Sequence, residues 1–156
     1  MAKQIYLDNA AATPIDRTVL KKMTPFLKGS FGNASSLYNL GREAKKALEA
    51  ARVRVAKVLG ARPQEIIFTG SGSESNNLAI FGIARAYKKF GKHLITTKIE
   101  HHSVLKPFGE LQKQGFKVTY LDVNKNGIVD LEKFKNVFRM SPGKQNHWAL
   151  GCLFYL

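Results

Sequence analysis

The sequence of 156 residues has a single cysteine, Cys152, and no long apolar run. One cysteine cannot form an internal disulfide, and such scarcity fits a cytoplasmic location. The longest apolar stretch, WALGCLFYL at residues 148–156, is far shorter than the roughly 20 residues that a membrane-spanning helix needs. The opening MAKQIYLDNA has an early aspartate and no apolar core, unlike a secretory signal. These absences favour a cytoplasmic protein without a membrane partner, and Cys152 lacks the surroundings of a reactive thiol.

Acidic residues are scarce beside basic ones, with 11 Asp and Glu against 25 Lys and Arg and a net charge of +14. Such an excess is typical of proteins that bind nucleic acid. Here, however, the basic residues are dispersed singly or in pairs over helix-like segments, without a long basic run or an aromatic RNA-binding motif. We therefore interpret the charge as solvated helix faces. A basic nucleic-acid-binding domain remains an alternative.

Metal-ligand patterns are also sparse. The segment DVNKNGIVDLEK at 122–133 resembles a calcium loop, but its twelfth position is lysine where a bidentate glutamate is required. Asn126-Gly127 favours a tight turn there instead. His101 and His102 are adjacent, so on a strand they point to opposite faces and cannot chelate one ion together. No metal is expected.

The hydrophobic periodicity predicts alternating strands and helices. Segment 40–59 is the clearest helix, and Gly60 supplies a left-handed stop after it. The last helix, 131–138, is expected to turn Leu131, Phe134 and Phe138 inward. This alternation predicts an α/β fold with βαβ units around a mostly parallel sheet. The expected strands are 4–7, 65–68, 93–97 and 116–123, and the other helices are 17–28, about 78–91 and 103–114.

Two polar segments follow strand-like residues, where α/β sheets bind ligands. In IIFTGSGSESNN at 66–77, backbone amides and serine hydroxyls before a helix suit a phosphate, with Glu74 facing away from it. The pattern matches neither the P-loop nor the dinucleotide fingerprint, so an ordinary helix-capping loop is an equal alternative. His101, in KIEHHSV, suits stacking on a planar ring or proton transfer. A hydrogen-bonded loop histidine is the other interpretation.

Four segments together resemble the cysteine desulfurases of the class V aminotransferase family. They are IYLDNAAATP (5–14), FGNASSLYNLGREAKKALEAARVRVAKVLGA (31–61), EIIFTGSGSESNNLAI (65–80) and TTKIEHHSVLKP (96–107). Their order and spacing match the family. On this resemblance, residues 1–139 are the N-terminal part of the pyridoxal-phosphate-binding large domain, and residues 140–156 are a tail, expected to be irregular, that resembles nothing in the family.

The resemblance implies a fold type I pyridoxal phosphate enzyme, of which this chain is a truncated part of the three-layer αβα large domain. Family members are homodimers that take sulfur from L-cysteine as an enzyme persulfide, release alanine, and pass sulfur to acceptor or scaffold proteins for iron–sulfur clusters or tRNA thiolation. By resemblance, Gly72 and Ser73 bind the cofactor phosphate and His101 stacks on the pyridine ring. Asn33 and the Ala11–Ala12 turn lie near the substrate entrance.

The departures from the family concern the chemistry. The Schiff-base lysine and the persulfide cysteine of the family have no counterpart in this sequence, so the fragment is expected to be inactive by itself. A truncated sheet also leaves an open edge and uncovered apolar faces, so we expect a marginally stable chain that associates. A second hypothesis is a non-catalytic or regulatory fragment that pairs with a full-length desulfurase.

Overall fold

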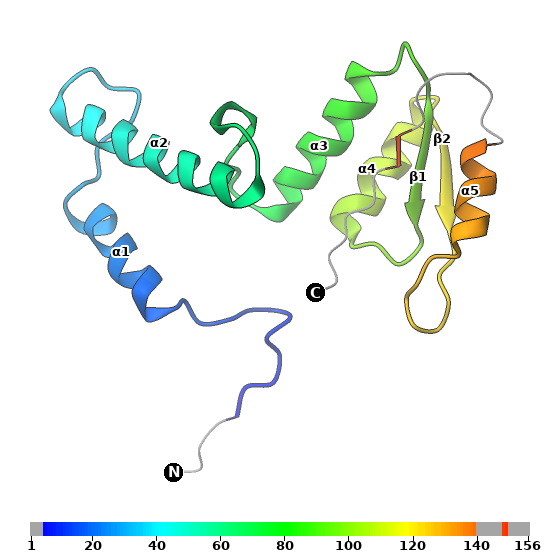
Figure 1. Ribbon diagram of the computed structural model, residues 1–156, viewed down its shortest axis with the longest axis horizontal. Helices are drawn as coiled ribbons and strands as arrows, with labels where there is room; N and C mark the ends of the chain where they lie inside the picture. The colour runs from blue at the N-terminus through cyan, green and yellow to red at the C-terminus, as the bar shows by residue number, and fades with distance from the viewer. Residues whose placement is uncertain (1–4, 140–147, 150–156) are drawn as a thin grey trace. The chain divides into compact units, whose positions relative to one another are not determined.

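The computed structural model describes residues 5–139 and 148–149. The chain forms two compact units, an N-terminal unit over Met1–Ile67 and a C-terminal unit over Phe68–Leu156. Figure 1 labels most of the helices and strands of both units. Within the described ranges, neither unit has a helix with the length and apolarity needed to cross a bilayer.

The N-terminal unit is helical. Its elements are α1 (Arg17–Lys28), α2 (Asn39–Leu59) and the short 3-10 helix η1 (Pro63–Glu65). The Asp16 carboxylate caps α1 by accepting a hydrogen bond of 2.7 Å from the Thr18 amide. At the end of α2, Gly60 has a φ of +64°, a left-handed conformation that glycine adopts without steric cost. The predicted helices 17–28 and 40–59 and the glycine stop are confirmed.

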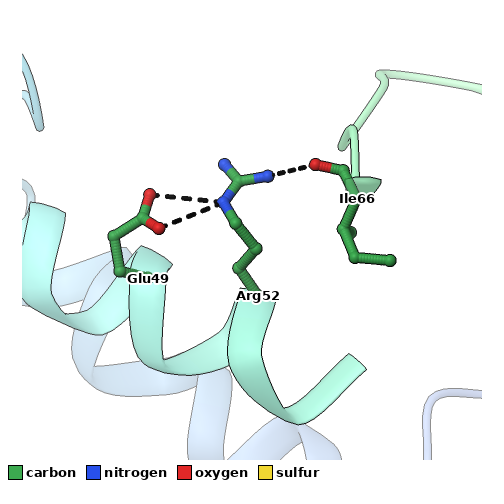
Figure 2. A network of polar contacts seen from close by, with 3 residues as sticks. All are labelled: Glu49, Arg52 and Ile66. Carbon is green, nitrogen blue, oxygen red and sulfur yellow. Dashed lines mark hydrogen bonds and ion pairs between the residues drawn. The ribbon is translucent and has the colours of Figure 1, made fainter. Parts of the chain in front are cut away.

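One arginine ties the end of this unit back onto α2. Figure 2 shows Arg52 between the Glu49 carboxylate, 3.2 Å from its Nε, and the backbone carbonyl of Ile66, to which its guanidinium also donates. Because the guanidinium is a planar fork of donors, binding on two sides fixes the direction of the side chain. The segment after η1 is therefore held beside α2 by a polar contact, with little apolar packing around it.

Apolar burial in the N-terminal unit is slight. Among the described residues, α1 has no buried residue, and α2 buries only Gly41 and Ala56. The 3.6-residue periodicity therefore predicts these helices correctly, although their apolar stripes are exposed. The exposed large apolar residues of α1 and α2 are Val19, Leu20, Met23, Phe26, Leu27, Leu40, Leu48, Val53, Val55, Val58 and Leu59.

The C-terminal unit is built on a parallel sheet. Strand β1 (His93–Thr97) pairs with β2 (Lys117–Leu121) over the whole length of both, in the register Leu94 opposite Val118. Helix α4 (His102–Lys113) connects the two strands, as a parallel crossover requires. The other helices are α3 (Gly72–Ala86), which precedes β1, and α5 (Leu131–Arg139), which follows β2.

The core of this unit joins α3 and α4 to the sheet. Phe108 and Leu111 of α4 are fully buried, and Ile80 of α3 is 1% exposed. A strand residue, Leu94, packs into the same cluster, so the two helices and β1 share one apolar interior. The cluster consists of Ile80, Ala84, Leu94, Val104, Phe108, Leu111 and Phe116.

Three sequence predictions about the elements are wrong. Strands were expected at 4–7 and 65–68, but the described residues 5–7 and 65–68 are not in a strand, Glu65 ends η1, and Ile67 is 67% exposed. Strand propensity reflects packing against neighbouring strands, and the apolar residues here lack such cover. In α5, Leu131 is 68% exposed and Phe138 40% exposed, so the helix exists but does not turn both inward.

Residues Trp148–Ala149 form a two-residue strand, β3, parallel to β1, so that the sheet order is β2-β1-β3. The tail at residues 140–156, which contains this strand, was expected to be irregular over its whole length. The rest of it, residues 140–147 and 150–156, lies outside the described residues.

Two leucines with opposite burial test the core of the C-terminal unit. Leu111→Ala removes a side chain that is 0% exposed, whereas Leu131→Ala removes one that is 68% exposed. We expect Leu111→Ala to lower the free energy of unfolding by about 2–5 kcal/mol, because it opens a cavity. Leu131→Ala should change it by less than about 0.5 kcal/mol. Urea denaturation measures both, and equal effects would contradict the assigned core.

The exposed apolar stripes of α1 and α2 also predict association. Large uncovered apolar patches promote contacts between chains. We expect the sedimentation coefficient of the purified chain to rise with concentration, and a dye that binds apolar surface to fluoresce with the native protein. A monomer with one sharp cooperative melting transition would argue against this expectation.

Candidate functional site

The N-terminus of α3 is capped by the loop that the sequence singles out. The Ser71 hydroxyl accepts a hydrogen bond of 3.2 Å from the Glu74 amide, so Ser71 is the N-cap. The helix begins at Gly72, and the amides of Gly72 and Ser73 belong to the first turn, where a helix supplies no acceptor of its own. The helix-capping interpretation is thus confirmed. It leaves these two amides available to an anion at the positive end of the helix.

The Glu74 side chain bends back to the loop. Its Oε2 accepts a hydrogen bond of 2.7 Å from the Gly70 amide. The sequence predicts that Glu74 faces away from a phosphate and acts on the first helical turn. The carboxylate holds the residue just before the cap, which commits the Gly70 amide, and its orientation relative to a phosphate stays a prediction. Any anion at this helix end therefore relies on Gly72 and Ser73.

His101 is the N-cap of α4. Its Nδ1 accepts a hydrogen bond of 3.1 Å from the Ser103 amide, and the Ser103 hydroxyl lies 2.8 Å from the same nitrogen. A hydrogen-bonded loop histidine, one of the two interpretations, is therefore confirmed. The cap uses only one edge of the ring, and the residue is exposed. The His102 ring lies 6.3 Å away between centroids, at an angle of 61°.

A pocket of about 750 Å³ lies along α3 and α4 and brings two predicted site residues together. Ser73 lines it from the first turn of α3, and His101 lines it from the cap of α4. Both helices begin at this pocket. The full lining is Ser73, Asn77, Phe81, His101, His102, Ser103, Lys106, Pro107, Gly109, Glu110 and Lys113.

The charges around the pocket are mostly positive. Two lysines, Lys106 and Lys113, line the pocket together with a single carboxylate, that of Glu110, whose Oε2 lies 3.3 Å from the Lys113 ammonium. Hydrogen bonds from Gln114 and then from Lys113 lower the pKa of Glu110 below its ordinary value. Glu110 is thus ionised at neutral pH and is bound to neighbours on its own helix. The remaining field favours an anionic ligand.

Sequence reasoning missed several residues of this pocket, notably Asn77 and Lys106. Asn77 lies four residues after Ser73, on the same face of α3, and its amide donates 2.7 Å to the Ser73 carbonyl. Lys106 follows His102 by four residues on α4. The i, i+4 spacing from Ser73 was therefore a signal that could have located Asn77, whereas Lys106 stands five residues after His101 and had no such signal.

The other predicted site residues belong to the N-terminal unit. The amides of Ala11 and Ala12 donate to the Asp8 carbonyl at 3.1 and 3.4 Å, which forms a turn. Asn33 caps its own loop, because its Oδ1 accepts 2.9 Å from the Ser35 amide. Their place near a substrate entrance stays a prediction.

The segment once compared with a calcium loop is a turn, as predicted. Gly127 has a φ of +77°, and its amide donates 2.9 Å to the Asn124 carbonyl. The Asn124 side-chain oxygen accepts from two backbone amides, those of Asn126 and Ile128. Asp122 is paired with Lys98 at 2.7 Å. Among the described residues, three or more His, Cys, Asp or Glu side chains do not gather as metal ligands.

Basic residues gather at the opposite end of α3. A second pocket, of about 630 Å³, is lined by Arg85, Lys88, Lys89 and Lys92. The carbonyl end of a helix carries partial negative charge, which cations stabilise. This cluster therefore has a structural explanation and does not by itself indicate nucleic acid.

Solved and curated proteins resemble this chain. Residues 5–142 match the family model "Aminotransferase class-V". The cysteine desulfurase IscS of Dictyoglomus turgidum is 50% identical over 139 residues, which are 89% of this chain and 35% of that protein. A putative cysteine desulfurase IscS 1 of Bacillus subtilis is 50% identical over 137 residues, 88% of this chain and 36% of that protein.

Two solved structures extend the likeness to the fold. A NifS-like protein has a TM-score of 0.82 and 40% identity over 86% of this chain and 37% of its own. The structure described as SspA in complex with cysteine has a TM-score of 0.78 and 41% identity, over 87% of this chain and 39% of its own. The α/β fold with a parallel sheet, expected from the sequence, is confirmed. The chain spans little more than a third of the length of these relatives.

The Lys98–Asp122 pair gives a test of the electrostatics next to β1. The hydrogen bond from Lys98, and then its charge, hold the pKa of Asp122 below the ordinary 3.8, with a smaller contribution from Lys133. We expect Lys98→Met to raise the pKa of Asp122 toward its ordinary value, and Lys133→Met to raise it less. Titration of the carboxyl carbon by NMR measures both shifts.

The sign of the linked stability follows from that pKa. A lower pKa in the folded chain means that the pair stabilises the fold above the unfolded pKa, and that this stabilisation is lost as pH falls through the folded pKa. In the Lys98→Met variant the acid-dependent loss should shrink. An unchanged pKa of Asp122 in that variant would contradict the assigned pair.

Proposed function

Because this chain belongs to the class V aminotransferase family, we propose that its C-terminal unit forms the phosphate and ring-stacking part of a pyridoxal phosphate site. The observation that carries this proposal is the meeting of Ser73 and His101 at one pocket. Ser73 comes from the first turn of α3, and His101 caps α4. The two positions are those that the family resemblance assigns to the phosphate and to the pyridine ring.

The phosphate would be bound by the start of α3. The Gly72 and Ser73 amides and the Ser73 hydroxyl are donors at a helix N-terminus, which is a favourable place for an anion. Lys106 adds positive charge to the same pocket. Glu74, the nearest acidic residue in sequence, is occupied by the Gly70 amide at 2.7 Å. The donor set therefore fits a phosphate ester.

The ring would lie against the His101 imidazole. The hydrogen bonds of His101 lie in the plane of its ring, at Nδ1, so they leave the flat face for contact. Planar rings gain from offset stacking, and the surrounding Phe81 adds apolar lining. When bound, pyridoxal phosphate would supply the electron-withdrawing ring on which amino-acid carbanions are stabilised. The part played by this chain would be to hold that ring in place.

The reaction is proposed from the relatives. They are named cysteine desulfurases, and one similar structure contains cysteine. We propose that the whole protein acts on L-cysteine in the cytoplasm, as a homodimer that passes sulfur to an acceptor or scaffold protein. The 156 residues by themselves are proposed to bind the cofactor without turning over cysteine, since the sequence shows no counterpart of the family's Schiff-base lysine or persulfide cysteine.

Titration with pyridoxal phosphate tests this site. We expect its visible absorbance to shift on binding, and pyridoxal, which lacks the phosphate, to bind much more weakly. His101→Ala should weaken binding up to about tenfold, the cost of an aromatic contact of about 1.5 kcal/mol. His102→Ala is the matched control, because it removes the neighbouring imidazole and leaves the proposed stacking residue, His101, in place.

The outcomes separate the parts of the proposal. Equal binding of pyridoxal and pyridoxal phosphate would contradict the phosphate role of α3. Equal effects of the two histidine substitutions would contradict the stacking role of His101. Sulfide release from cysteine, together with one lysine fixed specifically by borohydride, would show that these residues suffice for turnover and would overturn the proposed inactivity.

A further inference from the structure

A chain of three side chains runs from the interior of α3 to the His101 ring. The Asn76 side-chain amide donates a hydrogen bond of 2.8 Å to the Ser103 hydroxyl. That hydroxyl lies 2.8 Å from His101 Nδ1. Asn76 is only 7% exposed, and among the described residues it is one of two buried polar ones, the other being Thr96. A buried amide is seldom retained without a partner that needs it.

The direction of every hydrogen bond in this chain can be assigned. The Ser103 backbone amide can only donate, so at 3.1 Å it makes His101 Nδ1 an acceptor. The Asn76 NH₂ group can only donate to the Ser103 oxygen. The Ser103 hydroxyl proton is then left to point at Nδ1. The two contacts at Nδ1 share its one lone pair, and both fit the tautomer that has its proton on Nε2.

We propose that Asn76 is a positioning residue that fixes the tautomer and the plane of the His101 ring through Ser103. It lies three residues after Ser73, on the helix whose first turn faces the pocket. The chain of bonds therefore ties the proposed phosphate-binding helix to the proposed stacking residue. It sets the distance between the two halves of the site. The hydrogen bonds exist without a ligand, so the positioning of the ring does not depend on the proposed function. Its benefit to cofactor binding does rest on the proposed function.

The fixed tautomer has a consequence for the pocket. With Nδ1 accepting from the Ser103 amide, Nε2 carries the proton and can act as a donor. Rotation of the ring about its bonds would break both contacts to Ser103. Asn77, the neighbouring asparagine, is different, because its amide donates to the Ser73 carbonyl on its own helix. The two asparagines thus form a matched pair for an experiment.

The first measurement needs no ligand. In protein labelled with ¹⁵N-histidine, long-range ¹H–¹⁵N correlation at alkaline pH reports which ring nitrogen carries the proton. We expect His101 to show the Nε2–H tautomer, and Asn76→Leu and Ser103→Ala to shift its Nδ1 resonance. Ser103→Thr, which keeps the hydroxyl, should restore the native resonance, and Asn77→Leu should leave it unchanged. Unchanged His101 resonances in both Asn76→Leu and Ser103→Ala would overturn the proposal.

The second measurement is a double-substitution cycle on pyridoxal phosphate affinity. We expect Asn76→Leu to weaken binding about as much as His101→Ala, up to roughly tenfold, and the double variant to be weaker than either by less than about twofold. If the double variant loses affinity by the product of the two single-variant factors, the two residues act independently and the positioning role is wrong. If the Asn76→Leu variant does not fold, Ser103→Ala takes its place in the cycle, with Ser103→Thr as the rescue.

The two measurements separate this inference from the proposed function. If the native chain does not bind pyridoxal phosphate, the proposed function fails, yet the ring resonances still decide whether Asn76 and Ser103 hold His101. If the cofactor binds and His101→Ala weakens binding, but the His101 ring resonances do not change in Asn76→Leu, the proposed function stands and the positioning role is wrong.

Discussion

The packing of α3 against α4 is the constraint on which the candidate site depends. Ile80 of α3 and Phe108 and Leu111 of α4 meet in one buried cluster with Leu94 of β1. The apolar side chains further along the helices hold α3 and α4 together, and the hydrogen bond from Asn76 to Ser103 joins them near their N-termini. The pocket at the N-termini of α3 and α4 therefore depends on the packing of the apolar core. Loss of that core would separate Ser73 from His101 even if both caps stayed intact.

The two units differ in how they are held. The C-terminal unit has a parallel strand pair covered by two helices, and its largest buried side chains are all apolar. The N-terminal unit relies on helix caps and on Arg52, which joins α2 to the Ile66 carbonyl. Caps and single polar contacts each contribute only about 1 kcal/mol, far less than a filled apolar interior. The apolar stripes of α1 and α2 therefore remain a surface that another part of a longer protein, or another chain, has the chemistry to cover.

What the sequence predicts well is what is encoded locally. The helix at 40–59 follows from an apolar repeat and a glycine stop, both within one segment, and the turn at Asn126-Gly127 from two adjacent residues. The strand expected at 65–68 fails because strand formation depends on a partner that the segment does not contain. The places of Ser73 and His101 at the starts of two helices could be predicted because each follows strand-like residues. Asn76 could not, because its partner Ser103 is distant in sequence and its role appears only when α3 and α4 pack together.

The structural and the functional interpretations of the loop residues are not alternatives, because they use different atoms. At α3, the Ser71 hydroxyl and the Glu74 carboxylate hold the loop, and the first-turn amides at 72 and 73 are left for a ligand. At α4, Nδ1 of His101 caps the helix, and the ring face and Nε2 are left. A cap made by a side chain immobilises the residue that makes it. A binding residue that is free in the unliganded protein loses conformational entropy when a ligand arrives. The hydrogen bonds of these two caps already restrict the side chains, so that less entropy is left to lose on binding.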